Sequence, residues 1–268
     1  MIPNVLSIAG VDPSGGAGLL ADLKTFSALG AYGTGVVAAL TAQNTRGVNG
    51  VHPIPVDFIA RQIDTLFADV RIDAVKLGML GTSDVVSTVA EALRRHHVRR
   101  LVLDPVMVSK SGHHLLSADA VATLRRELLP LAEIVTPNLP EAEVLLGGAP
   151  IKTLADMRLA ARALHALGPR IVVLKGGHLD ASESIDVIDD GTHQVELPAP
   201  RIVTQNTHGT GCTLSAAIAA LLPRHDDPFD AIRAAKAWLT SAIAASGELS
   251  VGSGHGPVHH FHALWPKP

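Results

Sequence analysis

The sequence predicts an α/β fold with a mostly parallel central sheet and helices on both of its faces. Along the 268 residues, short runs of β-branched and aliphatic residues alternate with segments of helical periodicity. Most of these runs are uniformly apolar, as expected for strands that helices cover on both sides. No Pro- or Ser-rich linker breaks the alternation, so we expect one domain over residues 1–268.

The expected elements follow from this alternation. Strands are expected at 4–9, 35–40, 72–77, 100–105, 133–138 and 171–176. Helices are expected at about 15–29, 56–68, 83–97, 117–129, 140–147, 153–167, 212–222 and 227–246, the last two being separated by the prolines of PRHDDP. Residues 185–197 differ, because DDGT between two β-rich runs is typical of a hairpin. We therefore expect an antiparallel pair late in the sheet.

The composition excludes several classes of protein. With 25 acidic and 22 basic residues, a formal charge of −3 and 3% aromatic residues, the chain lacks the basic surface that nucleic acid requires. No run approaches the roughly 18 uncharged apolar residues of a membrane span, and the amino terminus lacks the basic start of a signal peptide. A single cysteine cannot form an internal disulfide. We expect a cytoplasmic protein whose partner is a small molecule.

A first glycine cluster, VDPSGGAG, follows the first expected strand. Gly16-Ala17-Gly18 begins a formal match to the dinucleotide-binding pattern. That pattern requires an acidic residue at the end of the second strand to bind a ribose. Here the strand ends in TAQNT, and the next acidic residue is Asp57, so the required acid is missing. The chain also contains no Gly-Lys dipeptide, so a Walker-type loop is absent. A tight turn or a substrate-binding loop explains the cluster better.

A second glycine cluster, THGTGC, precedes the strong helix formers TLSAAIAALL. Gly209 to Thr213 should form the first turn of a helix, whose unpaired N–H groups and partial positive charge suit a phosphate. The lone thiol, Cys212, lies in this turn. It is either a small buried hydrophobic residue or a thiol whose pKa the helix start lowers, and the residues alone do not decide between the two.

Eight collinear segments, from about residue 5 to residue 265, closely resemble the hydroxymethylpyrimidine/phosphomethylpyrimidine kinases of thiamine biosynthesis. They are AGVDPSGGAGLLADLKTFSALGAYG, TAQNTRGV, KLGML, LDPVMVSKSG, TPNLPEAEVLL, VLKGGH, NTHGTGCTLSAA and GPVHHFHALW. The GTG element is typical of the wider ribokinase-like superfamily. Gln43, and a cysteine in place of the usual aspartate after GTG, point to the pyrimidine kinase branch.

The resemblance implies a ribokinase-like three-layer sandwich and an ATP- and Mg²⁺-dependent kinase. The substrate would be 4-amino-5-hydroxymethyl-2-methylpyrimidine, converted to its monophosphate and then to its diphosphate. Pyridoxal kinase, which has the same fold, is the nearest alternative, and an enzyme could act on both substrates. A nicotinamide-dependent oxidoreductase or a non-catalytic binding protein is a more distant alternative.

The resemblance also implies roles for individual residues. Cys212 would be the general base, and the ATP phosphates would meet Lys175, Thr207, Gly209, Thr210 and Gly211. Mg²⁺ would be organised, partly through water, by Asp104, Asn138 and Glu141. The acceptor pocket would contain Gly10, Asp22, Gln43, Met79 and Val106, with the Gln43 amide pairing with the aminopyrimidine.

Each of these roles has a simpler structural alternative. Lys175 could be a solvated residue at a strand end, and Asp104 a polar one. Asp22 and Glu141 could stabilise helix amino termini, and for Glu141 this is compatible with metal binding. Met79 and Val106 could belong to the core.

The histidine-rich tail, GHGPVHHFHALW, has its own alternatives. Its histidines could bind a metal, but neighbouring histidines point in different directions and no carboxylate accompanies them. We expect the tail to dock on the domain, at a subunit contact of a homodimer. His208 is expected to shape its turn rather than to catalyse.

Overall fold

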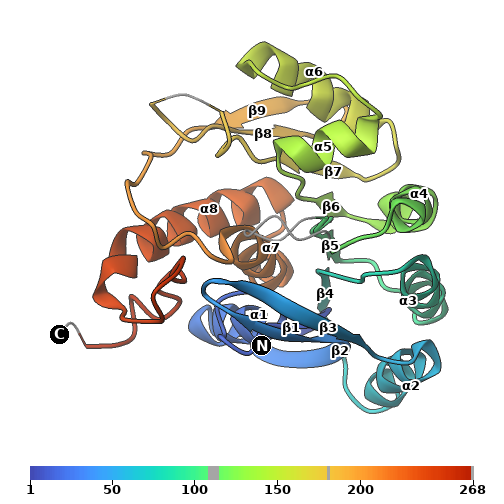
Figure 1. The fold of residues 1–268 in the computed structure, drawn as a ribbon. Coiled ribbons are helices and arrows are strands. Elements are labelled where there is room, and N and C mark those ends of the chain that lie inside the picture. The colour runs from blue at the N-terminus through green and yellow to red at the C-terminus, as the bar shows by residue number, and fades with distance from the viewer. Residues whose placement is uncertain (108–114, 180–181, 267–268) are drawn as a thin grey trace.

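The computed structural model describes residues 1–107, 115–179 and 182–266 and has the three layers that the sequence predicts (Figure 1). One nine-stranded sheet has the order β3-β2-β1-β4-β5-β6-β7-β8-β9. The strands are β1 (Asn4–Val11), β2 (Tyr32–Asn44), β3 (Gly47–Pro53), β4 (Ala74–Leu77), β5 (Leu101–Leu103), β6 (Ile134–Val135), β7 (Ile171–Leu174), β8 (Asp186–Asp189) and β9 (Gln194–Leu197). All neighbours from β2 to β7 are parallel.

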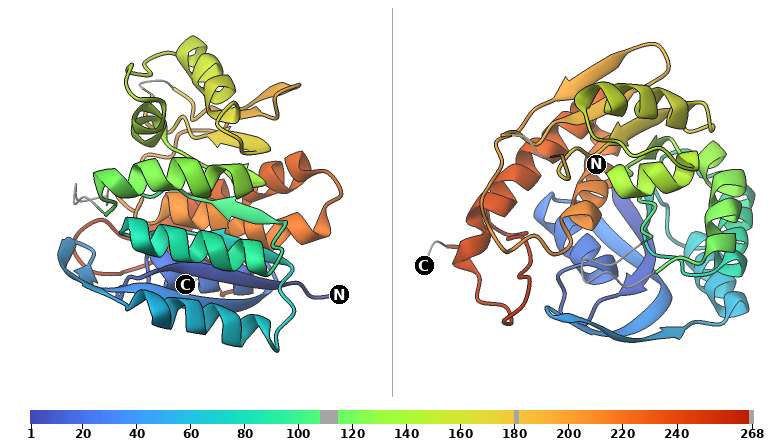
Figure 2. Two further views of the ribbon diagram at one scale, coloured as in Figure 1. Left: turned by 90° about the vertical axis from the view of Figure 1, so that its right-hand side faces the viewer. Right: turned by 45° about the horizontal axis from the view of Figure 1, so that its top comes forward.

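Helices cover both faces of this sheet, as the two views of Figure 2 show. They are α1 (Gly18–Ala28), α2 (Val56–Phe67), α3 (Ser83–Arg95), α4 (Ala118–Glu127), α5 (Leu139–Leu146), α6 (Leu154–His165), α7 (Thr210–Leu221) and α8 (Pro228–Ala244). One core holds the apolar side chains of α2 to α6, and the other holds those of α1, α7 and α8. Side chains of β1, β4 and β5 alternate between the two cores, which explains why these strands are apolar throughout.

Two hairpins close the ends of the sheet. The predicted pair is confirmed, because β8 is antiparallel to both β7 and β9. The β2–β3 hairpin was not predicted: β2 extends to Asn44, and β3 pairs with it in antiparallel fashion through a bulge at Ala42 and Gln43. Both strands are largely exposed and β3 contains two glycines, so the apolar signal of a buried strand is weak there.

Helix starts differ from the predictions where glycines form turns. The first helix begins at Gly18 instead of residue 15, because Gly15 and Gly18 adopt φ angles of 72° and 56°. The helix after the second glycine cluster begins at Thr210, two residues earlier than predicted. The first turn of α7 therefore includes Gly211 and Cys212.

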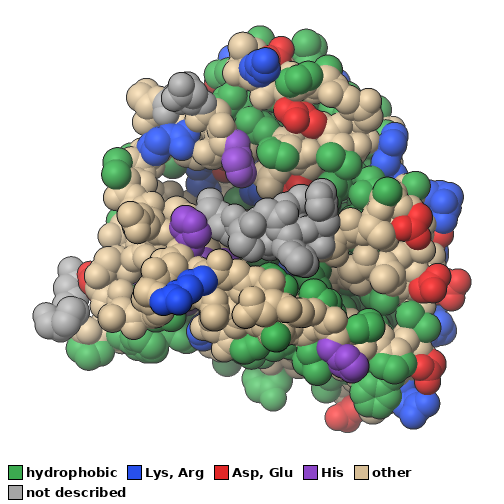
Figure 3. All heavy atoms as spheres, in the orientation of Figure 1, with side chains coloured by type: hydrophobic (Ala, Val, Ile, Leu, Met, Phe, Trp, Pro, Cys, Tyr) green, Lys and Arg blue, Asp and Glu red, His purple; other side chains and the backbone are tan. Residues whose placement is uncertain are grey.

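Charged side chains of both signs lie over α2, α3 and α4, on the right of Figure 3. Many of them form exposed ion pairs, such as Arg61 with Asp57 and Arg95 with Asp64. No helix within the described ranges is long and apolar enough to cross a membrane.

Candidate active site

The candidate site lies at the carboxyl-terminal edge of the parallel strands, where ligands bind in α/β folds. Asp104 directly follows β5, Asn138 lies beyond β6 and Lys175 directly follows β7. The start of α7 lies against these residues, because a Cβ atom added to Gly211 would lie 3.2 Å from Lys175 Nζ and 3.8 Å from Asp104 Oδ2. The sequence motifs of three separate strands and one helix thus meet at one place.

Lys175 is the centre of a buried cluster of charges. Its Nζ donates to Asp104 Oδ1 at 3.0 Å and lies 3.9 Å from Glu141 Oε2, and 13% of its side chain is exposed. Burial lowers the pKa of Lys175, but Asp104 and Glu141 outweigh this and raise the pKa above its ordinary value. The lysine is therefore charged at neutral pH, and it is not a freely solvated residue at a strand end.

Asp104 connects this cluster to the sheet and to α7. Its Oδ1 also accepts from Thr136 Oγ1 at 3.2 Å, and its Oδ2 accepts from Ser215 Oγ at 3.3 Å. Because the carboxylate is 2% exposed and bonded on both oxygens, its orientation is fixed before any ligand binds. Thr136 and Ser215 were not singled out in the sequence, although both lie inside the quoted motifs.

Asn138 and Glu141 form the capping box that begins α5. The Asn138 side chain accepts from the Glu141 N–H at 2.9 Å, and Glu141 Oε2 accepts from the Asn138 N–H at 2.7 Å. Burial raises the pKa of Glu141 to about 7, with Lys175 opposing the rise and Asp104 adding to it. Glu141 thus stabilises a helix start and also belongs to the charge cluster.

The phosphate turn, Thr207–Gly211, leads into α7. Thr210 Oγ1 donates to the Thr207 carbonyl at 2.8 Å, and Gly209 has a φ of 72°, which favours glycine. A Cβ atom on Gly209 would overlap the carbonyl oxygen of Gly16. The turn therefore packs directly on the first glycine cluster, here called the acceptor loop (residues 12–18).

His208 joins these two glycine segments. Its Nε2 lies 2.8 Å from Asp12 Oδ2, and its backbone N–H donates to the Gly256 carbonyl at 3.0 Å. Burial raises the pKa of Asp12, but hydrogen bonds from His208 and Ser14 lower it below its ordinary value. His208 shapes the turn as expected; Asp12 was missed, although a buried aspartate among glycines is a typical organiser of a loop.

Cys212 is half-buried in the first turn of α7. Burial raises the pKa of its thiol to about 11; Lys76 opposes this, and Asp104 and Asp22 add to it. Of the two alternatives that the sequence leaves open for this residue, the raised pKa favours the thiol. Burial is the largest cause of the rise, so Cys212 is mainly a thiol at neutral pH.

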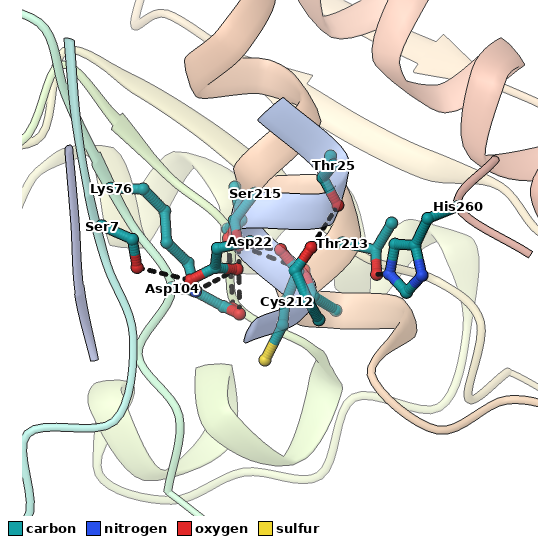
Figure 4. A network of polar contacts seen from close by, with 12 residues as sticks. Ser7, Asp22, Thr25, Lys76, Asp104, Cys212, Thr213, Ser215 and His260 are labelled. Atoms are coloured by element: carbon teal, nitrogen blue, oxygen red, sulfur yellow. Dashed lines mark hydrogen bonds and ion pairs between the residues drawn. The ribbon is translucent and has the colours of Figure 1, made fainter. Parts of the chain in front are cut away.

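Asp22 forms a buried ion pair with Lys76, which the sequence analysis did not identify (Figure 4). Both side chains are fully buried, Lys76 Nζ lies 2.8 Å from Asp22 Oδ2, and Ser7 Oγ donates to the same oxygen at 2.6 Å. Burial lowers the pKa of Lys76, but Asp22, Cys212 and Asp104 raise it well above its ordinary value. Asp22 therefore pairs across the sheet and does not cap its own helix.

Of the other predicted acceptor residues, Gly10 and Met79 are in contact with each other. A Cβ atom on Gly10 would lie 2.8 Å from Met79 Cε, so these two residues are in contact, and Met79 is 9% exposed. Gln43 is half-buried on β2, with Oε1 3.1 Å from Thr41 Oγ1. Val106, also half-buried, follows Asp104. Among the described residues, neither Gln43 nor Val106 is hydrogen-bonded to Gly10 or Met79. Residues 108–114, which belong partly to the LDPVMVSKSG segment, lie outside the described residues.

The histidine-rich tail docks on the domain, as expected. His255 donates its N–H to the Thr45 carbonyl at 2.9 Å, and Val258 belongs to the core beside α7 and α8. His260 Nε2 lies 3.2 Å from Thr213 Oγ1, whereas His259 Nε2 lies 3.8 Å from Glu248. These histidines point to different partners, and the described part of the chain holds no cluster of three or more metal-ligating side chains.

Comparison with known protein families identifies relatives along nearly the whole chain. The family model described as "Phosphomethylpyrimidine kinase" matches residues 12–259. A hydroxymethylpyrimidine/phosphomethylpyrimidine kinase of Escherichia coli is 56% identical over 262 residues, which is 98% of each chain. The protein of the same name from Bacillus subtilis is 42% identical and covers 97% of this chain and 95% of its own.

Solved structures have the same fold. A Bacillus subtilis pyridoxal kinase in complex with ADP has a TM-score of 0.90 at 37% identity, covering 98% of this chain and 99% of its own. A Staphylococcus aureus pyridoxal kinase in complex with AMP-PCP and pyridoxal has a TM-score of 0.90 at 34% identity, covering 98% and 95%. A phosphomethylpyrimidine kinase from Clostridium difficile has a TM-score of 0.80 at 41% identity, covering 90% and 99%.

Proposed function

Because the chain belongs to the phosphomethylpyrimidine kinase family, we propose that it phosphorylates 4-amino-5-hydroxymethyl-2-methylpyrimidine twice with ATP. The first transfer gives the monophosphate and the second gives the diphosphate, an intermediate of thiamine biosynthesis. The observation that carries the proposal is the Lys175–Asp104–Glu141 cluster against the glycine turn that begins α7. Phosphoryl transfer depends mostly on positioning and electrostatic stabilisation, which a fixed cation and unpaired helix N–H groups supply.

Each residue near the cluster has a part in this reaction. The Lys175 ammonium binds ATP phosphate oxygens, and the backbone of Gly209, Thr210 and Gly211 receives the γ-phosphoryl group. Thr207 holds the turn that presents these amides, since its carbonyl accepts from Thr210 Oγ1. A side chain at Gly211 would come close to the Lys175 amine, so glycine leaves room for the phosphate.

The charge cluster fits Mg²⁺. Asp104 and Glu141 provide oxygen donors, and Glu141 has a pKa raised to about 7 because it is buried near Asp104. A second cation beside Lys175 would balance the charges of Asp104 and Glu141, which Lys175 alone does not fully neutralise. When bound, Mg²⁺ neutralises phosphate charge; Asp104 and Glu141 would hold it, with Asn138 oriented through the capping box.

The acceptor pocket is proposed to contain Gly10, Met79, Gln43 and Val106, with Asp22 below it. The Gly10–Met79 contact supplies an apolar wall for a ring, and the Gln43 amide offers a donor and an acceptor. Asp22 acts through its ion pair with Lys76, since both charges are fully buried. Cys212 can accept the hydroxymethyl proton only in its thiolate form, which then becomes the thiol. Because its pKa is raised to about 11, this form is a small fraction of the protein at neutral pH.

Pyridoxal kinase is the second candidate function. The Staphylococcus aureus pyridoxal kinase bound to pyridoxal has a TM-score of 0.90 with this chain. Its identity of 34% is lower than the 56% of the Escherichia coli pyrimidine kinase, which makes pyridoxal at most an additional substrate.

The assembly and location of the chain are also proposals. We propose one domain, because a single sheet joins β3 to β9. A homodimer is proposed because exposed apolar side chains, among them Leu40, Val51 and Phe58, gather around β2, β3 and α2. A cytoplasmic location agrees with a single cysteine, which cannot form a disulfide within the chain.

One assay tests the function. Purified protein with Mg·ATP is given hydroxymethylpyrimidine, its monophosphate or pyridoxal, and ADP and phosphorylated product are measured. Release of ADP with both pyrimidines is expected. ADP release with pyridoxal alone would replace the proposal by the second candidate function, and no product from any acceptor would refute a kinase.

A further inference from the structure

We infer that Asp12 and His208 form a positioning pair that holds the phosphate turn against the acceptor loop and couples the two ligand sites. The inference rests on the proposed function, which assigns the turn to ATP and places Gly10 in the acceptor pocket; the loop touches Gly10 through Gly18, where an added Cβ atom would overlap the Gly10 carbonyl oxygen. Neither residue needs to touch a reacting atom. The pair acts by keeping two backbone segments from moving independently.

The carboxylate of Asp12 organises the whole acceptor loop. Its oxygens accept from the Ser14 N–H at 2.9 Å, from Ser14 Oγ at 2.8 Å and from the Ala17 N–H at 3.0 Å, as well as from His208 Nε2 at 2.8 Å. Only 3% of the Asp12 side chain is exposed. A buried carboxylate with this many donors keeps one geometry, so the loop and His208 share one anchor.

Steric contact makes the connection rigid. A Cβ atom on Gly16 would lie 2.5 Å from His208 Cδ2, and one on Gly209 would overlap the Gly16 carbonyl oxygen. The two segments therefore touch on both sides of the Asp12–His208 bond. Because close-packed groups cannot slide freely, a shift of the loop on acceptor binding has to move the start of α7.

His208 is held from a third side by the tail. Its N–H donates to the Gly256 carbonyl at 3.0 Å, and it forms an isolated bridge with Pro257. The backbone of His208 is thus fixed by the tail, while its side chain is held by Asp12. If His208 transmits the position of the loop to the turn, binding at one site must change affinity at the other by the same factor.

The test compares His208→Ala with His208→Gln, whose amide nitrogen can replace Nε2. His96→Ala is the matched control, because His96 Nε2 lies 2.7 Å from Asp64 in a pair at the end of α3, outside the site. ADP affinity is measured by calorimetry with and without hydroxymethylpyrimidine. We expect His208→Ala to weaken ADP binding by about 10-fold and to abolish the effect of the acceptor, within the usual range of coupling. His208→Gln should recover most of the ADP affinity and most of the effect of the acceptor on it. His96→Ala should match the parent in both measurements.

Hydrogen exchange gives a readout that needs neither turnover nor ligand. The amides of residues 209–213 should exchange faster in His208→Ala than in the parent, whereas His96→Ala should leave them unchanged. If the parent phosphorylates no acceptor, the proposed function fails, yet exchange still decides whether the pair holds the turn. Unchanged exchange and unchanged ADP coupling in His208→Ala would overturn the inference.

Discussion

Two lysines, one within a strand and one directly after a strand of the same sheet, serve different purposes. Lys76, the third residue of β4, is fully buried and paired with Asp22, whereas Lys175 follows β7 and is 13% exposed between Asp104 and Glu141. The charge of Lys76 is neutralised by Asp22 inside the protein. The charge of Lys175 reaches the edge of the sheet, where a phosphate can meet it. A lysine at a strand end is therefore not by itself a sign of ligand binding; exposure of the amine decides.

The largest expected effect concerns stability and the inner lysine. Lys76→Met leaves the buried Asp22 carboxyl without its cation, so it must either bury an unpaired charge or take up a proton. We therefore expect a loss of about 3–5 kcal/mol in the free energy of unfolding, measured by urea denaturation. Adding Asp22→Leu should restore most of the loss, and Arg61→Met, which removes an exposed ion pair, should cost less than about 1 kcal/mol. If Lys76→Met lost no more unfolding free energy than Arg61→Met, the stabilising role of the buried Lys76–Asp22 pair would be contradicted.

The outer lysine should affect activity rather than folding. Lys175→Met removes the cation that faces the phosphates, so kcat/KM should fall by about 10²–10³-fold, as for other lost electrostatic contacts. Its unfolding free energy should change less than that of Lys76→Met. Arg158→Met, which removes an exposed ion pair with Glu196, should leave kcat/KM at the parental value. Parental activity of Lys175→Met would exclude the assigned role.

Cys212 lies beside both lysines and should separate the two phosphorylation steps. Its pKa of about 11 means that proton removal from the hydroxymethyl group should become faster as pH rises above 7, whereas the phosphate of the second acceptor is already ionised. The first-step kcat should therefore rise with pH and the second should not, and Cys212→Ala should slow the first step by about 10²-fold and remove its pH dependence. Equal losses in both steps would leave Cys212 with a packing role.

The smallest effect is the pH dependence that Glu141 imposes on stability. Its pKa is about 7 in the folded protein and about 4.5 unfolded, so the folded state binds a proton more tightly. The contribution is present below about pH 4.5 and is lost as pH rises to about 7, by an amount on the order of 1–3 kcal/mol. Glu141→Gln keeps an acceptor for the Asn138 N–H, so its stability relative to the parent should improve across this window. A constant difference would show that Glu141 titrates normally.

The sequence predicted the layers well and the contacts of the site only partly. Apolar runs and glycine turns are local signals, which is why the parallel strands, the late hairpin and the start of α7 could be placed. Asp12 with His208 and Lys76 with Asp22 are separated by 196 and 54 residues, so their pairing depends on how the strands are ordered. The sequence left the state of Cys212 open for a similar reason, because its pKa depends first on burial in the folded chain and then on Asp104 and Asp22, which are distant in sequence.

The docked tail has a consequence for the order in which the protein is made. Residues 255–258 contact Thr45, Gln205 and His208, so a segment synthesised after β9 binds the turn beside the Lys175–Asp104–Glu141 cluster. Most of the sheet can form on the ribosome before this segment emerges, since domains generally begin to fold during synthesis. The phosphate turn can reach its final geometry only afterwards. The sheet of a nascent chain can therefore form before the tail contacts that hold the phosphate turn are in place.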